Sequence, residues 1–452
     1  MKTLKFNWYF ALASILMFNL AFTACDDEDD NMEKEPKEEM TNTIVDIAVA
    51  EPSFSILVDA LSKANLVSAL NGSTEYTVFA PTDDAFHALL TDLGASSLDD
   101  IPTEQLKMIL LNHVVSGSNT SSSLSTGYYS SISEKQDGYF YSLYFNKESL
   151  MINGMAKVTQ ADVMADNGII HIVDKVILPA SIKDHAVANP ALSSLTAAVV
   201  KAELAMTLDN DDNNFTVFAP TDDAFAMLLE NLDATLDDLS KEDLTPILLY
   251  HVVNAFVPAA NVTTSYVNTL AMGQDNYLSI NIEVGDNGVM INNKAKVVLT
   301  DVVTTNGVVH VIDKVIMPGT VVDAAINNSA FSILVEAVVK AELATTLSGE
   351  GAFTVFAPTN AAFEDLFAEL EVTGIADLSK EALTPILLAH VVSDNVRSTD
   401  LSSGTVPTLN TEKSIVIDIS NGVTIDGDIN VIIADVQATN GVVHAIDKVI
   451  VP

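Results

Sequence analysis

The sequence is poor in several residue types on which other classes of protein depend. Its 452 residues include one cysteine, Cys25, which excludes an internal disulfide and a cysteine-ligated metal site. Basic residues are scarce: 21 Lys and Arg stand against 61 Asp and Glu, and the formal net charge of −40 would repel nucleic acid. Aromatic residues make up only 6%, but hydrophobic residues reach 48%, a globular composition.

Long apolar runs are absent beyond the N-terminus, where one run is typical of a secretory signal. Lys2 and Lys5 flank its start, and apolar residues dominate positions 6–22. The run ends in Phe22-Thr23-Ala24-Cys25, which resembles the lipobox of bacterial lipoproteins, where the signal is cut before a cysteine that becomes lipid-modified. We therefore expect residues 1–24 to be a signal peptide and Cys25 to be the lipid attachment site. A secreted protein with a stray thiol and an uncleaved membrane anchor are the alternatives.

Acidic residues crowd the segment that follows, residues 25–40. Like-charge repulsion and the lack of apolar side chains favour an extended tether. An acidic run directly after the lipid cysteine also resembles the signal that some Gram-negative bacteria use to place lipoproteins on the outer face. We expect an outer membrane lipoprotein exposed on the cell surface; a plain spacer facing the periplasm is the alternative.

The rest of the chain consists of three copies of one unit. The block Thr77 to Phe86 returns as Thr216 to Phe225 and as Thr354 to Phe363, at intervals of about 140 residues. A second block ends each unit, at Pro179, Pro318 and Pro452. A period this long marks duplicated whole domains rather than solenoid repeats. We predict domains at 41–180, 181–318 and 319–452.

Helices and strands can be placed within a unit from its apolar pattern. Phe54, Leu57, Val58 and Leu61 have the spacing of a helix with one buried stripe, which we expect to open the domain. A short strand at 77–79 should follow and stop at Pro81.

Two further helices follow from the pattern. Thr82 is expected to cap a helix whose core face is Phe86, Leu89, Leu90 and Leu93. A third helix, from about 103 to 112, should end at a histidine. Pro246 and Pro385 stand inside this helix in the other two copies and should kink or split it.

The last part of each unit reads as β-structure. In the second copy, strands are expected at 290–291, 295–299, 301–302 and 308–317, with a turn at Asn306-Gly307 that needs positive φ.

Three sequence blocks carry a specific resemblance. They are Thr-Val-Phe-Ala-Pro-Thr, Leu-Leu-x-His-Val-Val and Asn-Gly-x-x-His-x-x-Asp-x-Val-Ile-x-Pro, in this order in every copy. Together they resemble the fasciclin (FAS1) domain family over essentially everything after residue 41. The resemblance implies an α+β fold, a β-wedge or sandwich with several helices packed along it. It also implies a role in adhesion to cells, matrix or polysaccharide, because known members are mostly extracellular or surface-anchored proteins with that role.

Six histidines occupy two repeated positions. One position follows the third helix, at His113, His251 and His390, and the other lies in the last strand, at His171, His310 and His444. A structural role as a buried hydrogen-bonding group is the favoured interpretation for both. In the fasciclin family a Tyr-His pair before the Val-Val strand has been linked to receptor recognition. Tyr250-His251 matches it in full, whereas the other two copies keep only the histidine, so the candidate binding surface is Tyr250, His251, His113 and His390.

The sequence gives little support for a catalytic site or a metal site. His171 and Asp174 recur as His310 with Asp313 and His444 with Asp447, but residues three apart in a strand point to opposite faces, so the acid is expected to fix the strand edge. Asp209 to Asn213 begins like a calcium loop, yet Asn214 and Pro220 stand where glycine and glutamate are needed.

The sequence therefore predicts a surface-anchored lipoprotein that mediates adhesion or recognises extracellular protein or polysaccharide through tandem domains. We predict no enzymatic activity, no cofactor and no metal, and no nucleic-acid partner. A periplasmic solute- or glycan-binding lipoprotein is the alternative, and a hydrolytic enzyme ranks last because no nucleophile, base and orienting group recur together.

Overall fold

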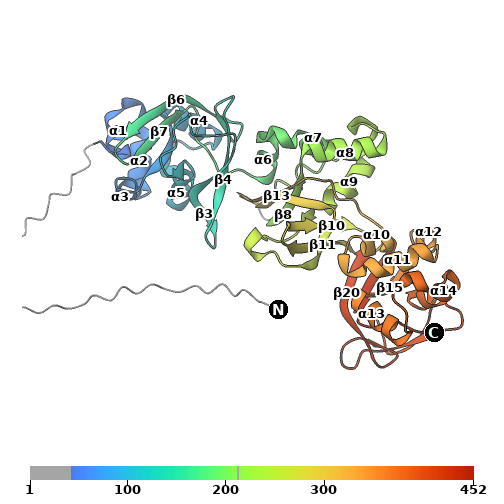
Figure 1. Cartoon of the computed structure of the whole chain (residues 1–452). Helices are drawn as coiled ribbons and strands as arrows, with labels where there is room; N and C mark the ends of the chain where they lie inside the picture. The colour runs from blue at the N-terminus through green and yellow to red at the C-terminus, as the bar shows by residue number, and fades with distance from the viewer. Residues whose placement is uncertain (1–41, 211–212) are drawn as a thin grey trace, which may run out of the picture. The chain divides into compact units, whose positions relative to one another are not determined.

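The computed structural model describes residues 42–210 and 213–452 (Figure 1). The predicted signal peptide, the acidic tether and Cys25 lie outside this part of the chain. Within it, one α+β arrangement of a seven-stranded sheet and several helices occurs three times, which confirms the predicted fold class. We call the three copies domain 1 (41–180), domain 2 (181–318) and domain 3 (319–452). None of the helices in the described ranges has the length and hydropathy needed to cross a membrane.

Domain 1 closes its strands into a barrel in the order β1-β2-β3-β4-β5-β6-β7. The barrel closes where Val115 of β2 pairs with Ser131 of β3. Its helices are α1 (Ile44–Ala50), α2 (Ser55–Lys63), α3 (Val67–Leu70), α4 (Asp83–Asp92) and α5 (Thr103–Asn112), with 3-10 turns η1 (Pro52–Phe54) and η2 (Leu98–Asp100). Its strands are β1 (Tyr76–Pro81), β2 (Val114–Ser116), β3 (Gly127–Gln136), β4 (Tyr139–Asn146), β5 (Met151–Ile152), β6 (Ala156–Ala165) and β7 (Gly168–Val173).

Domain 2 has an open sheet in the order β10-β11-β12-β13-β14-β8-β9. Its helices are α6 (Ile182–Ala188), α7 (Ser193–Lys201), α8 (Asp222–Leu232) and α9 (Lys241–Tyr250), with 3-10 turns η3 (Pro190–Leu192), η4 (Leu236–Asp238) and η5 (Ala259–Asn261). Its strands are β8 (Phe215–Pro220), β9 (Val252–Val253), β10 (Ser265–Met272), β11 (Tyr277–Gly285), β12 (Gly288–Ile291), β13 (Ala295–Thr304) and β14 (Gly307–Ile312).

Domain 3 repeats the open sheet in the order β16-β15-β21-β20-β19-β18-β17. Its helices are α10 (Val321–Ile326), α11 (Ser332–Lys340), α12 (Ala344–Leu347), α13 (Asn360–Glu369) and α14 (Lys380–Ala389), with 3-10 turns η6 (Ser329–Phe331) and η7 (Ile375–Asp377). Its strands are β15 (Phe353–Pro358), β16 (Val391–Val392), β17 (Gly404–Pro407), β18 (Ser414–Asp418), β19 (Thr424–Ile425), β20 (Ile429–Ala438) and β21 (Gly441–Ile446).

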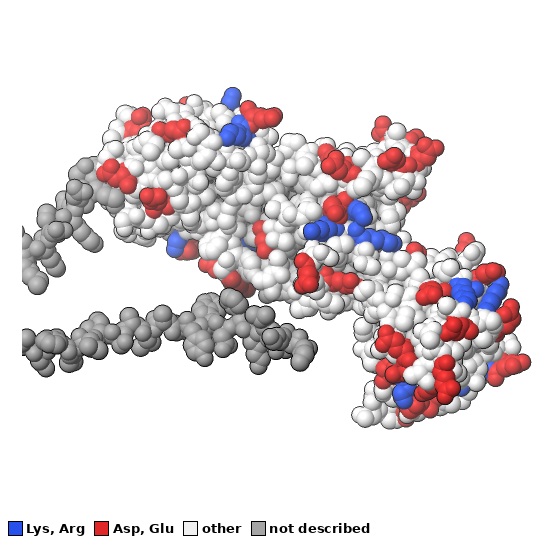
Figure 2. Space-filling model, viewed as in Figure 1, with Lys and Arg blue, Asp and Glu red and all other residues white. Residues whose placement is uncertain are grey.

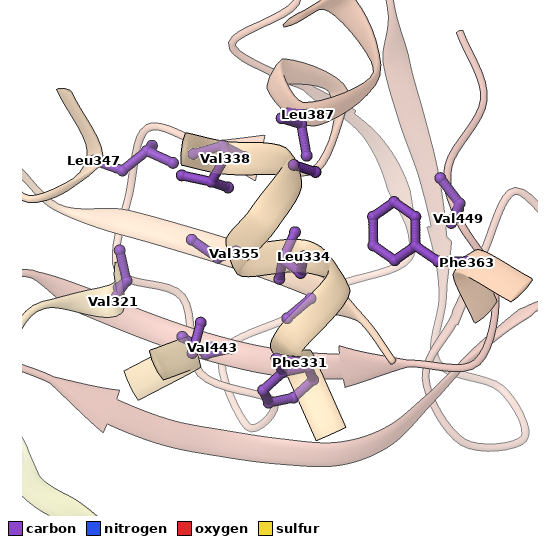
Figure 3. Close-up of a cluster of buried hydrophobic side chains, with 14 of the residues drawn as sticks. Val321, Phe331, Leu334, Val338, Leu347, Val355, Phe363, Leu387, Val443 and Val449 are labelled. Atoms are coloured by element: carbon purple, nitrogen blue, oxygen red, sulfur yellow. The ribbon is translucent and has the colours of Figure 1, made fainter. Parts of the chain in front are cut away.

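The first strand of each domain separates two hydrophobic cores. Successive side chains of a strand point to opposite faces. In β1, Val78 and Ala80 therefore pack with the helices, whereas Phe79 packs with the long hairpin β3–β4 and its neighbours. Domains 2 and 3 divide their cores in the same way. Figure 3 shows part of the helix-side core of domain 3, where Val338 and Leu334 of α11 lie over Val355 of β15.

A short first helix precedes the helix that the sequence pattern predicts as the opening of each domain. In domain 1, Thr43 caps α1 by accepting the Asp46 N–H, and Asp46 returns a bond to the Thr43 N–H. The side chain of Asn167, in the turn between β6 and β7, accepts the Ile44 N–H at 2.8 Å. Asn306 and Asn440 do the same for Ile182 and Val321. The repeated Asn-Gly turn thus fastens the first helix to the sheet.

The structure confirms most predicted elements and corrects three details. The Thr82 cap and the third helix are where the pattern places them. Leu93 is the C-cap of α4 and is 46% exposed, so it is not a core residue. α9 and α14 are not split by their prolines. The N–H that Pro246 lacks would bond the carbonyl of Glu242, an exposed first-turn residue, where water can replace it. The last strand of domain 2 ends at Ile312, earlier than predicted.

Candidate functional site

The histidine that directly follows helix α5, α9 or α14 is buried in every domain. In domain 2, His251 is 2% exposed; its Nδ1–H donates to the carbonyl oxygen of Ile247 at 2.8 Å, and its Nε2 accepts the Ile316 N–H at 3.1 Å. The two backbone partners fix one neutral tautomer, and burial lowers the His251 pKa to about 4. The same two bonds recur for His113 with Ile109 and Ile177, and for His390 with Ile386 and Ile450. This histidine therefore joins the end of each domain to helix α5, α9 or α14.

Tyr250 is also inside the protein, with 4% of its surface exposed. Its hydroxyl donates to the carbonyl oxygen of Ser279 at 2.8 Å and accepts from the Asn292 amide at 3.1 Å. Burial raises the Tyr250 pKa to about 12. The four residues of the candidate binding surface, Tyr250, His251, His113 and His390, are therefore all buried side chains.

The second repeated histidine holds a bulge in the neighbouring strand. His171 accepts the Asp162 N–H at Nδ1, and its Nε2–H donates to the carbonyl oxygen of Asn119 at 3.0 Å. Asp174 instead accepts the Lys157 N–H at 2.8 Å, at the start of β6. His171 and Asp174 thus act on different segments and form no dyad. Domains 2 and 3 repeat these contacts through His310, Asp313, His444 and Asp447.

An apolar pocket in domain 2 has the buried histidine in its wall. It encloses about 110 Å³ between α6 and α7, with His251 among its lining residues. Two lining residues reach the surface: Val187 of α6 is 65% exposed and Val200 of α7 is 64% exposed. Thr196, a polar residue of the lining, donates its hydroxyl to the carbonyl oxygens of Ala186 and Leu192. The pocket is therefore open to solvent at its rim and offers almost only hydrocarbon inside.

Domain 3 has the same pocket between α10 and α11. It encloses about 80 Å³ and includes His390 in its lining. Its rim is formed by Ile326 and Val339, which are 43% and 61% exposed. The lining residues Leu334, Val338, Leu347, Val355 and Leu387 can be followed in Figure 3.

Domain 1 fills the corresponding space. Only about 20 Å³ remains beside His113. Leu61 and Val67 of domain 1 stand where domain 2 has Val199 and Ala205 and where domain 3 has Val338 and Ala344. The two exchanges remove three carbons from the wall of the pocket. Larger side chains thus account for the smaller space in domain 1.

Sequence reasoning identified the histidine but missed the pocket. The pocket could have been inferred from the two residue exchanges at positions 61 and 67. These become visible when the three copies are aligned on their first two helices. Exposed valines on the second helix, Val200 and Val339, where domain 1 has Ser62, were a second signal.

Acidic residues do not gather into a metal site in the described ranges, where no group of three His, Cys, Asp or Glu has the geometry to hold an ion. Asp209, at the start of the calcium-like loop, contacts the ammonium of Lys183 and accepts from the Ser181 hydroxyl at 2.9 Å. Residues 211–212 of that loop lie outside the described ranges, as does Cys25.

Comparisons with known proteins identify the repeated unit. The Fasciclin domain model matches residues 52–179, 190–318 and 329–452. Transforming growth factor-beta-induced protein ig-h3 of Sus scrofa is 28% identical over 428 residues, which cover 91% of this chain and 58% of that protein. Periostin of Homo sapiens is 25% identical over 416 residues, covering 91% and 47%. The chain spans about half the length of these two relatives.

A shorter bacterial relative and a solved structure complete the comparison. Protein sll1483 of Synechocystis sp. is 42% identical over 133 residues, covering 29% of this chain and 73% of that protein. The FAS1 domain pair of the insect cell adhesion molecule fasciclin I is 19% identical, covers 60% of this chain and 95% of that one, and has a TM-score of 0.36.

Proposed function

Because the chain belongs to the fasciclin family, with one fasciclin domain in each of its three units, we propose that it is a surface-anchored lipoprotein that binds extracellular protein or polysaccharide. Fasciclin domains are found in cell-adhesion proteins, which supports an adhesion or recognition role. The observation that carries the proposal is the tandem arrangement, because three linked modules can add weak contacts into firm attachment when they engage together.

The membrane contact in this proposal is a lipid at Cys25. It rests on the sequence alone: the apolar run that ends at this sole cysteine, and the acidic residues 26–30 directly after it. A tether of this kind would hold the three domains away from the membrane. The chain would then face the outside of the cell, where an adhesion protein has access to its partner.

A non-enzymatic role fits the named relatives, which are fasciclin-domain proteins. It also fits the chemistry of the repeated histidines, whose ring nitrogens are occupied by backbone groups. A periplasmic binding lipoprotein is the second candidate, and the apolar pockets of domains 2 and 3, which have room for a small ligand group, favour it.

Protease treatment of intact cells tests the location. We expect the native chain to be digested from outside, and the Cys25→Ala variant to be released from the membrane fraction. Lysed cells treated in parallel show that the protease can cut the folded chain. Protection of the native protein on intact cells, with digestion after lysis, would favour the periplasmic candidate.

Binding assays test the adhesion role itself. The mature chain, immobilised at high density, should retain cells or extracellular proteins from the same environment, and single domains should retain fewer because they lose the gain from linkage. A blank result with the intact chain on cells, proteins and glycans would remove this proposal.

A further inference from the structure

We propose that the pockets of domains 2 and 3 each bind a leucine or isoleucine side chain that a basic segment of an extracellular protein presents, whereas domain 1 does not. The inference rests on the proposed adhesion role and specifies its partner. It selects protein over polysaccharide and assigns recognition to two of the three domains.

The size of the pockets sets the size of the group they accept. An apolar cavity of about 150 Å³ is known to hold a benzene ring. The pockets here enclose about 110 Å³ in domain 2 and about 80 Å³ in domain 3, too little for an aromatic ring or a long acyl chain. A branched group of four carbons, the side chain of leucine or isoleucine, matches this space.

The lining excludes a sugar. A buried hydroxyl needs a hydrogen-bond partner, and its loss of hydration is costly without one. In domain 3 the one polar side chain of the lining is His390, and both of its ring nitrogens are engaged by Ile386 and Ile450. In domain 2 both ring nitrogens of His251 are engaged, Thr196 donates its hydroxyl to two backbone carbonyl oxygens, and Lys183 pairs with Asp209. Only a hydrocarbon group can enter without leaving polar atoms unpaired.

The charge of the surroundings favours a basic segment around that group. Over the whole chain, Asp and Glu outnumber Lys and Arg by 61 to 21, and Figure 2 shows acidic side chains spread over the face, with Lys and Arg in a few groups among them. Glu336 is exposed on α11, one helical turn before the rim residue Val339. In domain 2, Lys183 at the rim is neutralised by Asp209. A lysine or arginine beside the aliphatic residue would therefore be attracted, and an acidic neighbour repelled.

The open rims make the pockets accessible. Val187, Val200, Ile326 and Val339 expose between 43% and 65% of their surface although they also line the pockets. Domain 1 has Ser62 in place of Val200 and Val339. Leu61 lines its smaller space, and Val67 packs against the same core. Domain 1 keeps an exposed valine at the first-helix position of the rim, Val49, which is 64% exposed, but its second helix has a serine at the rim and only about 20 Å³ lies behind it.

Methyl NMR of the full mature chain tests the inference, with the peptide acetyl-Lys-Leu-Lys-amide as the probe. We expect the peptide to shift methyl signals of the rim residues Val187 and Ile326, which both variants below retain, but not those of domain 1. The alanine peptide acetyl-Lys-Ala-Lys-amide should bind about tenfold more weakly or worse, because burial of the leucine side chain supplies the attraction. The glutamate-flanked peptide acetyl-Glu-Leu-Glu-amide should also bind more weakly.

Two variants act as matched controls. One fills the pockets with the residues of domain 1 (V199L, A205V, V338L, A344V), and the other replaces the rims (V200S, V339S). Both should lose the leucine-dependent shifts. The rim variant changes only exposed side chains, so it keeps the test valid if the filled variant does not fold.

Each outcome decides between the two proposals. Loss of the peptide shifts together with weaker cell retention in either variant supports the inference. Absent shifts in the native chain, or shifts that persist in both variants, would overturn the inference; if cells are still retained, the adhesion role stands without it. A native chain that neither responds to the peptide nor retains cells overturns both.

Discussion

Domain 1 and domains 2 and 3 share one framework but differ in the space they leave inside it. In all three, a neutral histidine links helix α5, α9 or α14 to the end of the domain. In all three, an asparagine in the turn before the last strand holds the first helix. Domain 1 closes its barrel and fills the space beside the histidine, whereas the other two have open sheets and keep a pocket. Duplication thus preserved the bonds that hold the fold and let the packing around them diverge.

Replacing the repeated glycine of the last strand should have the largest effect, and an equal one in each domain. Gly307 has a φ of +159°, and a Cβ there would overlap the carbonyl oxygen of Phe215. We expect Gly307→Ala to cost about 4 kcal/mol or more, because strand β14 would separate from β8. Urea titration, read on methyl signals of each domain, measures the loss.

The same substitution at Gly168 and at Gly441 provides the comparison, because both positions have the same clash with the first strand. Similar losses would show that this contact belongs to the shared framework. A domain that tolerates the alanine would contradict that interpretation.

Acidification should destabilise domain 2 more than domains 1 and 3. Burial lowers the pKa of His251 to about 4, and domain 2 has a second such residue, His185, which lies against Tyr128 of domain 1. Below pH 6.5 the unfolded chain binds protons that the folded chain does not, so stability falls as the pH decreases towards 4. Each of these histidines should cost about 3 kcal/mol at pH 4. Urea titrations at pH 7 and pH 4 should show the larger loss in domain 2.

The variant His185→Ala is the control, because domain 3 has Ala324 at this position. It should reduce the pH dependence of domain 2 to that of domain 3. An equal acid sensitivity of domains 2 and 3 in the native chain would argue against this account.

Local signals in the sequence were enough for much of the framework. Thr82 was recognisable as a helix cap because its hydroxyl can accept a first-turn N–H, here that of Ala85. The apolar stripe from Phe54 to Leu61 was enough to predict the second helix. The repeated histidine could be identified from its recurrence. Its favoured structural role agrees with the bonds that His251 forms.

Long-range contacts account for what the sequence did not reveal. α1 is seven residues long, rich in β-branched side chains, and held by Asn167 from more than a hundred residues away. Tyr250 matches a family pattern linked to recognition, yet its hydroxyl is bound by Ser279 in β11 and Asn292 in the turn after β12. The pocket depends on differences of one or two carbons between domains, which a hydrophobic pattern treats as equivalent.

Opening domain 1 should convert it towards domain 3. The double substitution Leu61→Val and Val67→Ala removes one carbon from a buried side chain and two from a half-buried one and leaves a cavity, so we expect a loss of about 2 kcal/mol. Urea titration measures the cost, and xenon-dependent shifts of domain 1 methyl signals report the new space. If xenon finds no site in the variant, neighbouring side chains have collapsed into the gap, and the two exchanges do not account for the pockets.

Filling domain 2 is the reverse experiment and should have the smallest effect on stability. Val199→Leu with Ala205→Val adds the same three carbons to a space of about 110 Å³ that is open at its rim, so the side chains can enter without displacing the backbone. We expect a gain of at most about 1 kcal/mol in urea titration, less than domain 1 loses, because part of the added surface already contacts solvent in the native pocket. A loss of stability instead would mean that the first two helices of domain 2 are spaced differently from those of domain 1, and that the pocket is maintained by the backbone rather than by two small side chains.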